Sequence, residues 1–64
     1  STLSKQIRYG LKYMALISID QDDFERVIKF GFAKKPGDEI SKYLIFELMG
    51  KHSNIFYLDR KYKN

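Results

Sequence analysis

The chain has 64 residues, enough for one small domain of marginal stability. Hydrophobic residues make up 44% of it, with five Phe and five Tyr, and such a composition excludes an intrinsically disordered chain. There is no Cys, which excludes disulfides and thiolate chemistry, and the net charge of +4 favours polyanions such as nucleic acid without requiring one.

Apolar residues near the start of the chain recur with a helical period. The stripe consists of Leu3, Ile7, Leu11 and Met14, while the basic residues Lys5, Arg8 and Lys12 fall on a different face. This pattern predicts an amphipathic helix over about residues 3–13. Gly10 lowers its helical propensity by about 1 kcal/mol relative to Ala.

From Ala15 onward the apolar period changes to two, which is typical of β-strands. The alternation predicts strands over about residues 15–20, 25–33, 42–48 and 55–59. In the first of these, Ala15, Ile17 and Ile19 are expected on one face. Between the second and third, the run Lys35-Pro36-Gly37-Asp38 predicts a type II turn, because Pro presets φ at the second position and Gly accepts the positive φ that follows.

The predicted fold class is therefore α+β, with an N-terminal helix followed by a four-stranded antiparallel meander. One helix can cover only one face of a sheet, whereas apolar residues occur on both faces. We therefore expect the other face to contact the remainder of a longer chain, or a second copy in a homodimer. The longest uninterrupted apolar run, residues 14–17, is too short to span a bilayer, so we expect no membrane partner.

Polar residues between the last two expected strands form the first candidate site. They are Gly50, Lys51, His52, Ser53 and Asn54, and they interrupt two apolar runs with residue types that a turn alone rarely requires. Gly can adopt a positive φ, Lys and His supply charge and donors, and Ser and Asn add hydrogen bonds to phosphate or ribose. The alternative is a tight hairpin in which Asn54 bonds to nearby backbone and His52 is merely exposed.

Glu25 and Arg26, at the start of the second expected strand, form the other candidate site. The guanidinium of Arg26 suits phosphate recognition because its planar fork offers paired donors. The alternative is a surface ion pair between the two side chains, worth at most about 1 kcal/mol.

Other chemistry has little support in the sequence. A single His without Cys, and without a second His three or four residues away, provides no metal site. Ser53, His52 and Asp59 do not suit a catalytic triad, because adjacent residues of a strand point apart. We expect no metal, no cofactor and no independent catalytic site in this segment.

Both candidate segments resemble a known family. The Met-Gly-x-His-x-Asn centre at residues 49–54, and the run that places Ile19 and Gln21 ahead of Arg26, are similar to the N-terminal domain of the NFACT proteins, which include RqcH and NEMF. Two departures stand out. Glu25 replaces the Asp that is usual in the family, which extends the carboxylate by one methylene, and Lys51 replaces a more usual Arg, which keeps the charge but loses the bidentate fork.

The resemblance implies a fragment of a larger domain that is similar in fold to the N-terminal domain of formamidopyrimidine-DNA glycosylases. It also implies a cytoplasmic role in ribosome-associated quality control, with tRNA and the large ribosomal subunit as partners and C-terminal tailing of stalled chains as the outcome. On this reading Glu25 and Arg26 take part in the tRNA-dependent step, and residues 50–54 form the signature loop.

Three other functions remain open beside it. Some family members are labelled fibronectin- or fibrinogen-binding, which would make this an adhesin, but the segment shows no export or anchor feature. A glycosylase would be an enzyme, and the characteristic Pro-Glu amino terminus of that class is absent. The segment could also be a structural scaffold that contacts no ligand.

Overall fold

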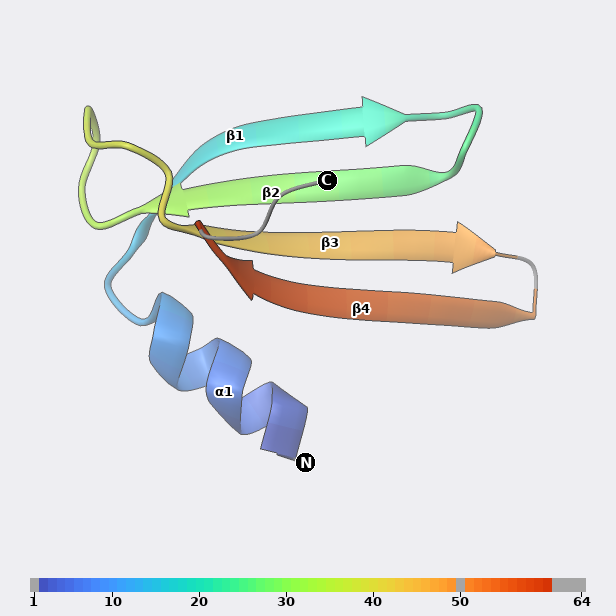
Figure 1. Ribbon diagram of the computed structural model, residues 1–64, viewed down its shortest axis with the longest axis horizontal. Coiled ribbons are helices and arrows are strands. Elements are labelled where there is room, and N and C mark those ends of the chain that lie inside the picture. Colours follow the sequence, from blue (N-terminus) through green and yellow to red (C-terminus); the bar gives the residue numbers. More distant parts are fainter. Residues whose placement is uncertain (1, 50, 61–64) are drawn as a thin grey trace.

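The computed structural model describes residues 2–49 and 51–60. Helix α1 (Thr2–Leu11) is followed by the strands β1 (Ala15–Asp22), β2 (Val27–Ala33), β3 (Lys42–Met49) and β4 (His52–Asp59). Each strand pairs antiparallel with the next, so the four form an open sheet in sequence order (Figure 1). The α+β fold, one helix and then a four-stranded meander, is confirmed.

Helix α1 ends two residues earlier than the expected range of 3–13. Tyr13 adopts a left-handed backbone conformation with φ of 66°, which cannot continue a right-handed helix. The N–H of Met14 then donates a hydrogen bond of 3.0 Å to the carbonyl of Leu11, which satisfies one of the free carbonyl groups at the helix end. The chain leaves this turn directly into β1.

The expected alternation of β1 is wrong beyond its second residue, because the strand contains a β-bulge. Leu16 pairs with Phe32, and Ser18 pairs with Gly31, so Ile17 is an extra residue with no counterpart on β2. A bulge of this kind moves every later side chain to the face opposite to the one that strict alternation predicts. The strand also continues two residues further than expected, to Asp22.

The connection between β2 and β3 contains the expected turn. Gly37 has a φ of +94°, and the N–H of Asp38 donates a hydrogen bond of 3.1 Å to the carbonyl of Lys35. Both features are those predicted for the Pro-Gly pair. From there Ile40 folds back over the sheet, since a Cβ added at Gly31 would lie 2.8 Å from its Cδ1.

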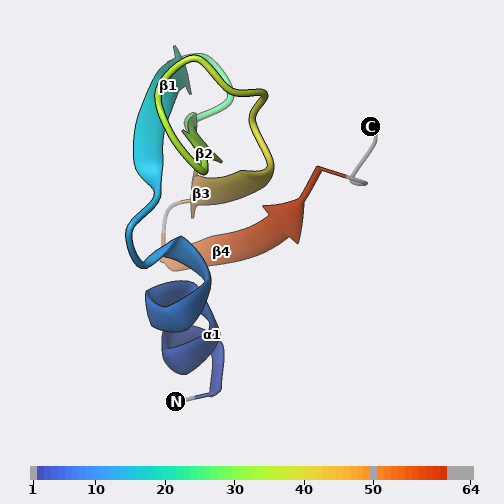
Figure 2. The ribbon, with the colours of Figure 1, turned by 90° about the vertical axis from the view of Figure 1, so that its left-hand side faces the viewer.

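The strand register divides the sheet into two faces, and α1 lies on one of them (Figure 2). We call this the helix face. It carries Leu16, Ile19, Ile28, Phe30, Phe32, Leu44, Phe46, Leu48, Ile55 and Tyr57. Phe30 and Phe46 pack edge to face there, with ring centroids 5.6 Å apart. The helix contacts this face through Gly10, where a Cβ would lie 1.8 Å from the hydroxyl of Tyr57.

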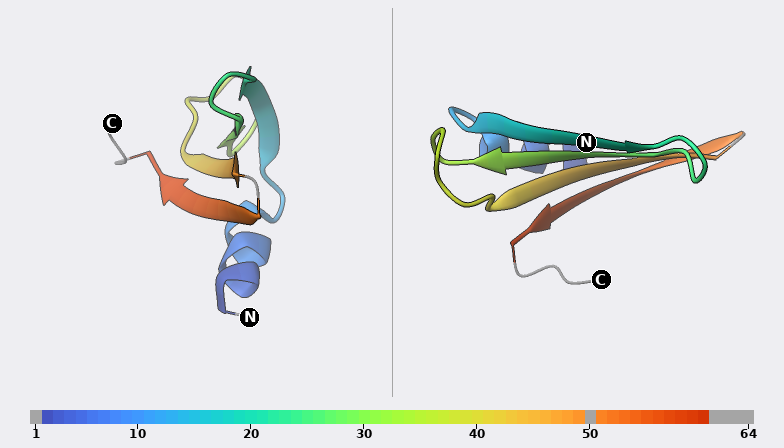
Figure 3. Two further views of the ribbon diagram at one scale, coloured as in Figure 1. Left: turned by 90° about the vertical axis from the view of Figure 1, so that its right-hand side faces the viewer. Right: turned by 90° about the horizontal axis from the view of Figure 1, so that it is seen from above.

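The opposite face holds the most buried apolar residues that the structure describes. Ala33 is fully buried and Ile45 is 8% exposed. Tyr43 lies on the same face, and the ammonium of Lys29 sits 4.6 Å from the centre of its ring. The strands twist strongly along their length (Figure 3), so the two faces are saddle-shaped rather than flat.

Helix α1 is too short to cover the helix face. Leu16, Ile19, Leu48 and Ile55 remain exposed there, Ile19 by 59%. Apolar side chains in this number on one sheet face usually mark contact with more protein. The helix face therefore also has uncovered apolar surface, whereas the expectation that further chain or a second copy covers the face opposite the helix stays a prediction. No helix among the described residues is long and apolar enough to cross a membrane.

Candidate nucleic-acid interface

The two candidate segments, more than twenty residues apart in sequence, lie at the same end of the sheet. The turns that follow β1 and β3 are both at the right-hand end of Figure 1. The carbonyl of Arg26 accepts a hydrogen bond of 2.8 Å from the N–H of Leu48, and Leu48 pairs with Ser53 on β4. Neighbouring strands are about 4.8 Å apart, and Arg26 and Ser53 lie on either side of β3. Their Cα atoms are therefore only about 10 Å apart.

Glu25 and Arg26 lie in a turn rather than in β2, which begins at Val27 and not at Glu25 as expected. The cause is Asp22, whose Oδ1 accepts hydrogen bonds from the N–H groups of Phe24 at 3.0 Å and Glu25 at 3.1 Å. Such a bond pattern fixes a turn in place of a strand ladder. Arg26 completes it with a φ of 56°, a conformation that non-glycine residues adopt rarely.

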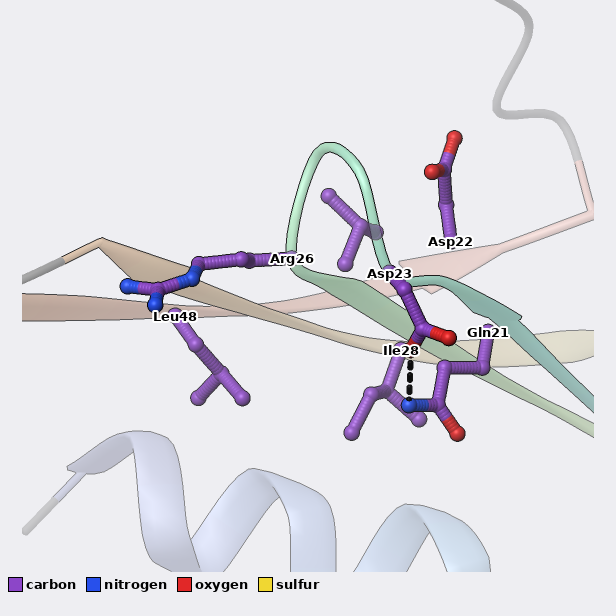
Figure 4. A pocket seen from close by; sticks show the side chains of 7 residues that line it. Gln21, Asp22, Asp23, Arg26, Ile28 and Leu48 are labelled. Atoms are coloured by element: carbon purple, nitrogen blue, oxygen red, sulfur yellow. Dashed lines mark hydrogen bonds between the residues drawn. The ribbon is translucent and has the colours of Figure 1, made fainter.

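The guanidinium of Arg26 is exposed and extends away from the carboxylates of Asp22 and Asp23 (Figure 4). These residues, together with Gln21, Val27, Ile28 and Leu48, line a cavity of about 410 Å³. A salt bridge joins Arg60 Nη1 to Glu39 Oε2 at 3.0 Å at the other end of the sheet, but among the described residues none joins Glu25 to Arg26. The ion pair considered for Glu25 and Arg26 is therefore not formed.

The signature segment is less of a loop than expected. Strand β4 begins at His52, three residues before Ile55, so only two residues connect it to Met49. The connection is thus a tight hairpin, as the alternative interpretation had it. Gly50 and the side chain of His52 lie outside the described residues.

The other members of this segment are accessible. Lys51, Ser53 and Asn54 are all exposed. Ser53 pairs with Leu48 and shares the helix face, whereas Asn54 pairs with Glu47 on the opposite face. Five of the seven proposed site residues, Glu25, Arg26, Lys51, Ser53 and Asn54, therefore offer exposed polar groups around one end of the sheet.

This end of the sheet is mixed in charge and is not a basic patch. Arg26 and Lys51 are accompanied by the carboxylates of Asp22, Asp23, Glu25 and Glu47. No group of three or more acidic or His residues in the described part of the chain is arranged to hold a metal ion. The arrangement can bind a phosphate at Arg26 or Lys51 and can accept hydrogen bonds at the carboxylates.

Residues 21–23 read as a polar turn in the sequence, but the turn lies at residues 23–26, and the bonds that hold it were not predicted. Gln21 donates a hydrogen bond of 2.5 Å to Asp23 Oδ1, and Asp22 holds the backbone as described above. Phe24, between them and Arg26, is 97% exposed. An aromatic residue within a run of charged turn residues is the signal that could have drawn attention to it.

The fold and the site together define a small α+β module that carries two polar turns side by side at one end of an open sheet. Comparison with known proteins places it in a family: the model for the NFACT N-terminal and middle domains matches residues 1–64. The chain therefore belongs to the NFACT family.

Three relatives named Rqc2 homolog RqcH, one from Streptococcus suis and two from Streptococcus pneumoniae, are each 37% identical to the chain over 62 residues. These alignments cover 94% of the chain and 11% of each relative. The chain thus spans about a ninth of the length of these proteins. No solved structure matches it significantly.

Proposed function

We propose that this segment binds RNA at the sheet end formed by Glu25, Arg26 and residues 50–54. The RNA is tRNA on the large ribosomal subunit, and the complete protein is a quality-control factor that recruits tRNA for C-terminal tailing of stalled nascent chains. Membership of the NFACT family and the similarity to proteins named RqcH support this role.

The observation that carries the proposal is the backbone hydrogen bond between Leu48 N–H and the Arg26 carbonyl. It ties the first turn to the end of β3, just before the second turn, so that exposed polar groups from both turns can contact a single ligand. An adhesin role has no feature of the sheet end in its favour.

The mixed charge of this end shapes the expected mode of binding. A basic patch attracts any polyanion, whereas one Arg and one Lys among four carboxylates favour phosphate at only certain positions. The residues named at this end sum to a net charge of −2, so the net positive charge of the chain lies outside it and would help to attract RNA from a distance.

The test is the affinity of the complete protein for tRNA, with Arg26→Ala compared with Arg60→Ala. Both variants remove one exposed Arg, but Arg60 lies at the other end of the sheet. Arg26→Ala should weaken binding about tenfold or more, because one phosphate contact is lost. For the same reason, the slope of log affinity against log salt concentration should become shallower by about 0.7 to 0.9. Arg60→Ala should bind within about twofold of wild type. Equal effects of the two variants would refute the site.

A further inference from the structure

The turn between β1 and β2 holds an aromatic side chain almost completely in water. Phe24 is 97% exposed, the largest exposure among the large apolar residues that the structure describes. An apolar side chain in that position buries no surface and so contributes nothing to this fold. Its role therefore lies in a contact with another molecule or another part of the protein.

The turn presents Phe24 in a fixed place. Asp22 Oδ1 accepts hydrogen bonds from the N–H groups of Phe24 and Glu25, and the Arg26 carbonyl accepts another from Leu48. The turn is thereby held at both ends. A contact made by Phe24 costs little additional ordering of the backbone, which is what makes such a residue effective in binding.

The immediate neighbours of Phe24 indicate the chemistry of its partner. In sequence they are Asp23, Glu25 and, one residue on, Arg26, all charged and exposed. A hydrophobic protein surface would have to leave these charges unsatisfied on contact. A nucleobase has an apolar face and polar edges, and it suits an isolated aromatic ring surrounded by hydrogen-bonding groups.

The positions of the charges indicate where the phosphate of a bound nucleotide would lie. Phosphate is repelled by the carboxylates of Asp22 and Asp23, whereas the guanidinium of Arg26 extends away from both (Figure 4). A nucleotide can therefore place its phosphate at Arg26 and its base over Phe24. The carboxylate of Glu25 can accept a hydrogen bond from an exocyclic amino group of that base.

We propose that Phe24 is a stacking platform for one unpaired nucleobase of the bound RNA. Glu25 accepts a hydrogen bond from the edge of that base, and Arg26 binds an adjacent phosphate. A base within a duplex is already stacked and paired, so this site selects single-stranded or loop RNA. The inference rests on the RNA-binding function proposed above.

The experiment measures binding of the complete protein to a single-stranded RNA oligonucleotide and to the same strand in a duplex. Three substitutions separate the contributions of the ring: Phe24→Ala removes it, Phe24→Leu keeps an apolar side chain without a π face, and Phe24→Tyr keeps the ring. We expect Phe24→Ala and Phe24→Leu to weaken single-strand binding roughly 5- to 150-fold, and Phe24→Tyr to stay within about twofold. Duplex affinity and the salt slope should not change, because no charge is removed.

A second readout reports stacking directly. The oligonucleotide carries the fluorescent base 2-aminopurine at one position at a time, and stacking on an aromatic ring should quench it at one position. Quenching should be retained in Phe24→Tyr and lost in Phe24→Leu. Full RNA affinity in Phe24→Leu would overturn the proposal, because it would show an apolar contact without stacking.

Two further results would also overturn it, and they are distinguishable from a failure of the proposed function. If Phe24→Ala binds single-stranded RNA like wild type while Arg26→Ala does not, the RNA site stands and the stacking role is wrong. If Phe24→Ala lowers the thermal unfolding midpoint of the complete protein, Phe24 packs against another part of that protein instead. Absence of RNA binding by the wild type would remove both proposals.

Discussion

Replacement of Gly10 by Ala should destabilise the protein, although Ala is the better helix former. Ala gains about 1 kcal/mol over Gly in a helix interior. Against this, the added Cβ would lie 1.8 Å from the hydroxyl and 2.7 Å from Cζ of Tyr57. These atoms belong to a rigid ring on the helix face, so either the ring leaves its place or α1 separates from the sheet.

The expected change in the free energy of unfolding is the difference between these two effects. Forcing an extra methyl group into a close contact typically costs about 1 to 3 kcal/mol, and an overlap of this size belongs at the upper end. After the gain in helical propensity is subtracted, the net loss should be about 2 kcal/mol. The prediction therefore differs in sign from one based on helix propensity alone.

Urea denaturation of the complete protein, followed by hydrogen exchange of the amides in α1 and β4, measures this loss. Tyr57→Ala provides the control background: without the ring, Gly10→Ala should become stabilising by about 1 kcal/mol, which gives a coupling energy of about 3 kcal/mol between the two positions. A stabilising effect of Gly10→Ala in both backgrounds would show that the helix does not dock on Tyr57.

Two other predictions concern the stability of the sheet and its first turn. Burial raises the pKa of Tyr57 above its ordinary value of 10.0, and its hydroxyl has no hydrogen-bond partner within the described residues. The folded state keeps this proton while the unfolded state begins to lose it, so stability should fall as the pH rises above about 10. Tyr57→Phe should raise the unfolding free energy by about 1 kcal/mol and reduce that fall, and identical pH profiles for both proteins would contradict the assignment. Asp22→Ala should lower stability by about 1 to 2 kcal/mol, because two backbone N–H groups lose their acceptor, whereas Asp22→Asn keeps an acceptor and should lose less than half as much. Equal losses in the two Asp22 variants, measured by urea denaturation, would show that the turn does not depend on those bonds.

The sequence was sufficient for the order and type of the elements. Spacing of apolar residues such as Leu3 and Ile7 marked the helix, and strict alternation marked the strands. Turn chemistry was equally readable at Gly37, whose positive φ follows from its position after Pro36. These features depend on residues close together in the chain.

Features that depend on contacts between distant residues were not readable. The bulge at Ile17 is set by pairing with β2 and leaves no mark on the alternation. Ser53 and Asn54 have the composition of a loop, yet pairing with β3 draws them into β4. Arg26 has no side-chain property that predicts a left-handed backbone, which arises here from the turn that Asp22 fixes.

The candidate site was predicted in composition but not in arrangement. The residue types of both segments suggested nucleic-acid contact, whereas their meeting at Arg26 and Leu48 depends on the direction and register of β2 and β3. Phe24 stands within the second segment in sequence, but its almost complete exposure is a property of the fold and was not predicted from its residue type. The sequence thus indicated which groups are present, and the sheet determined which of them act together.

Photo-crosslinking of the complete protein to tRNA tests the location of the proposed RNA site most directly. A benzophenone amino acid replaces Ser53 at the proposed site, and Asp38, in the loop at the opposite end of the sheet, serves as the control position. Both side chains are exposed. The proposed arrangement predicts a tRNA crosslink from position 53 that weakens when Arg26 is changed to Ala, and none from position 38. Crosslinks from position 38 alone would contradict it.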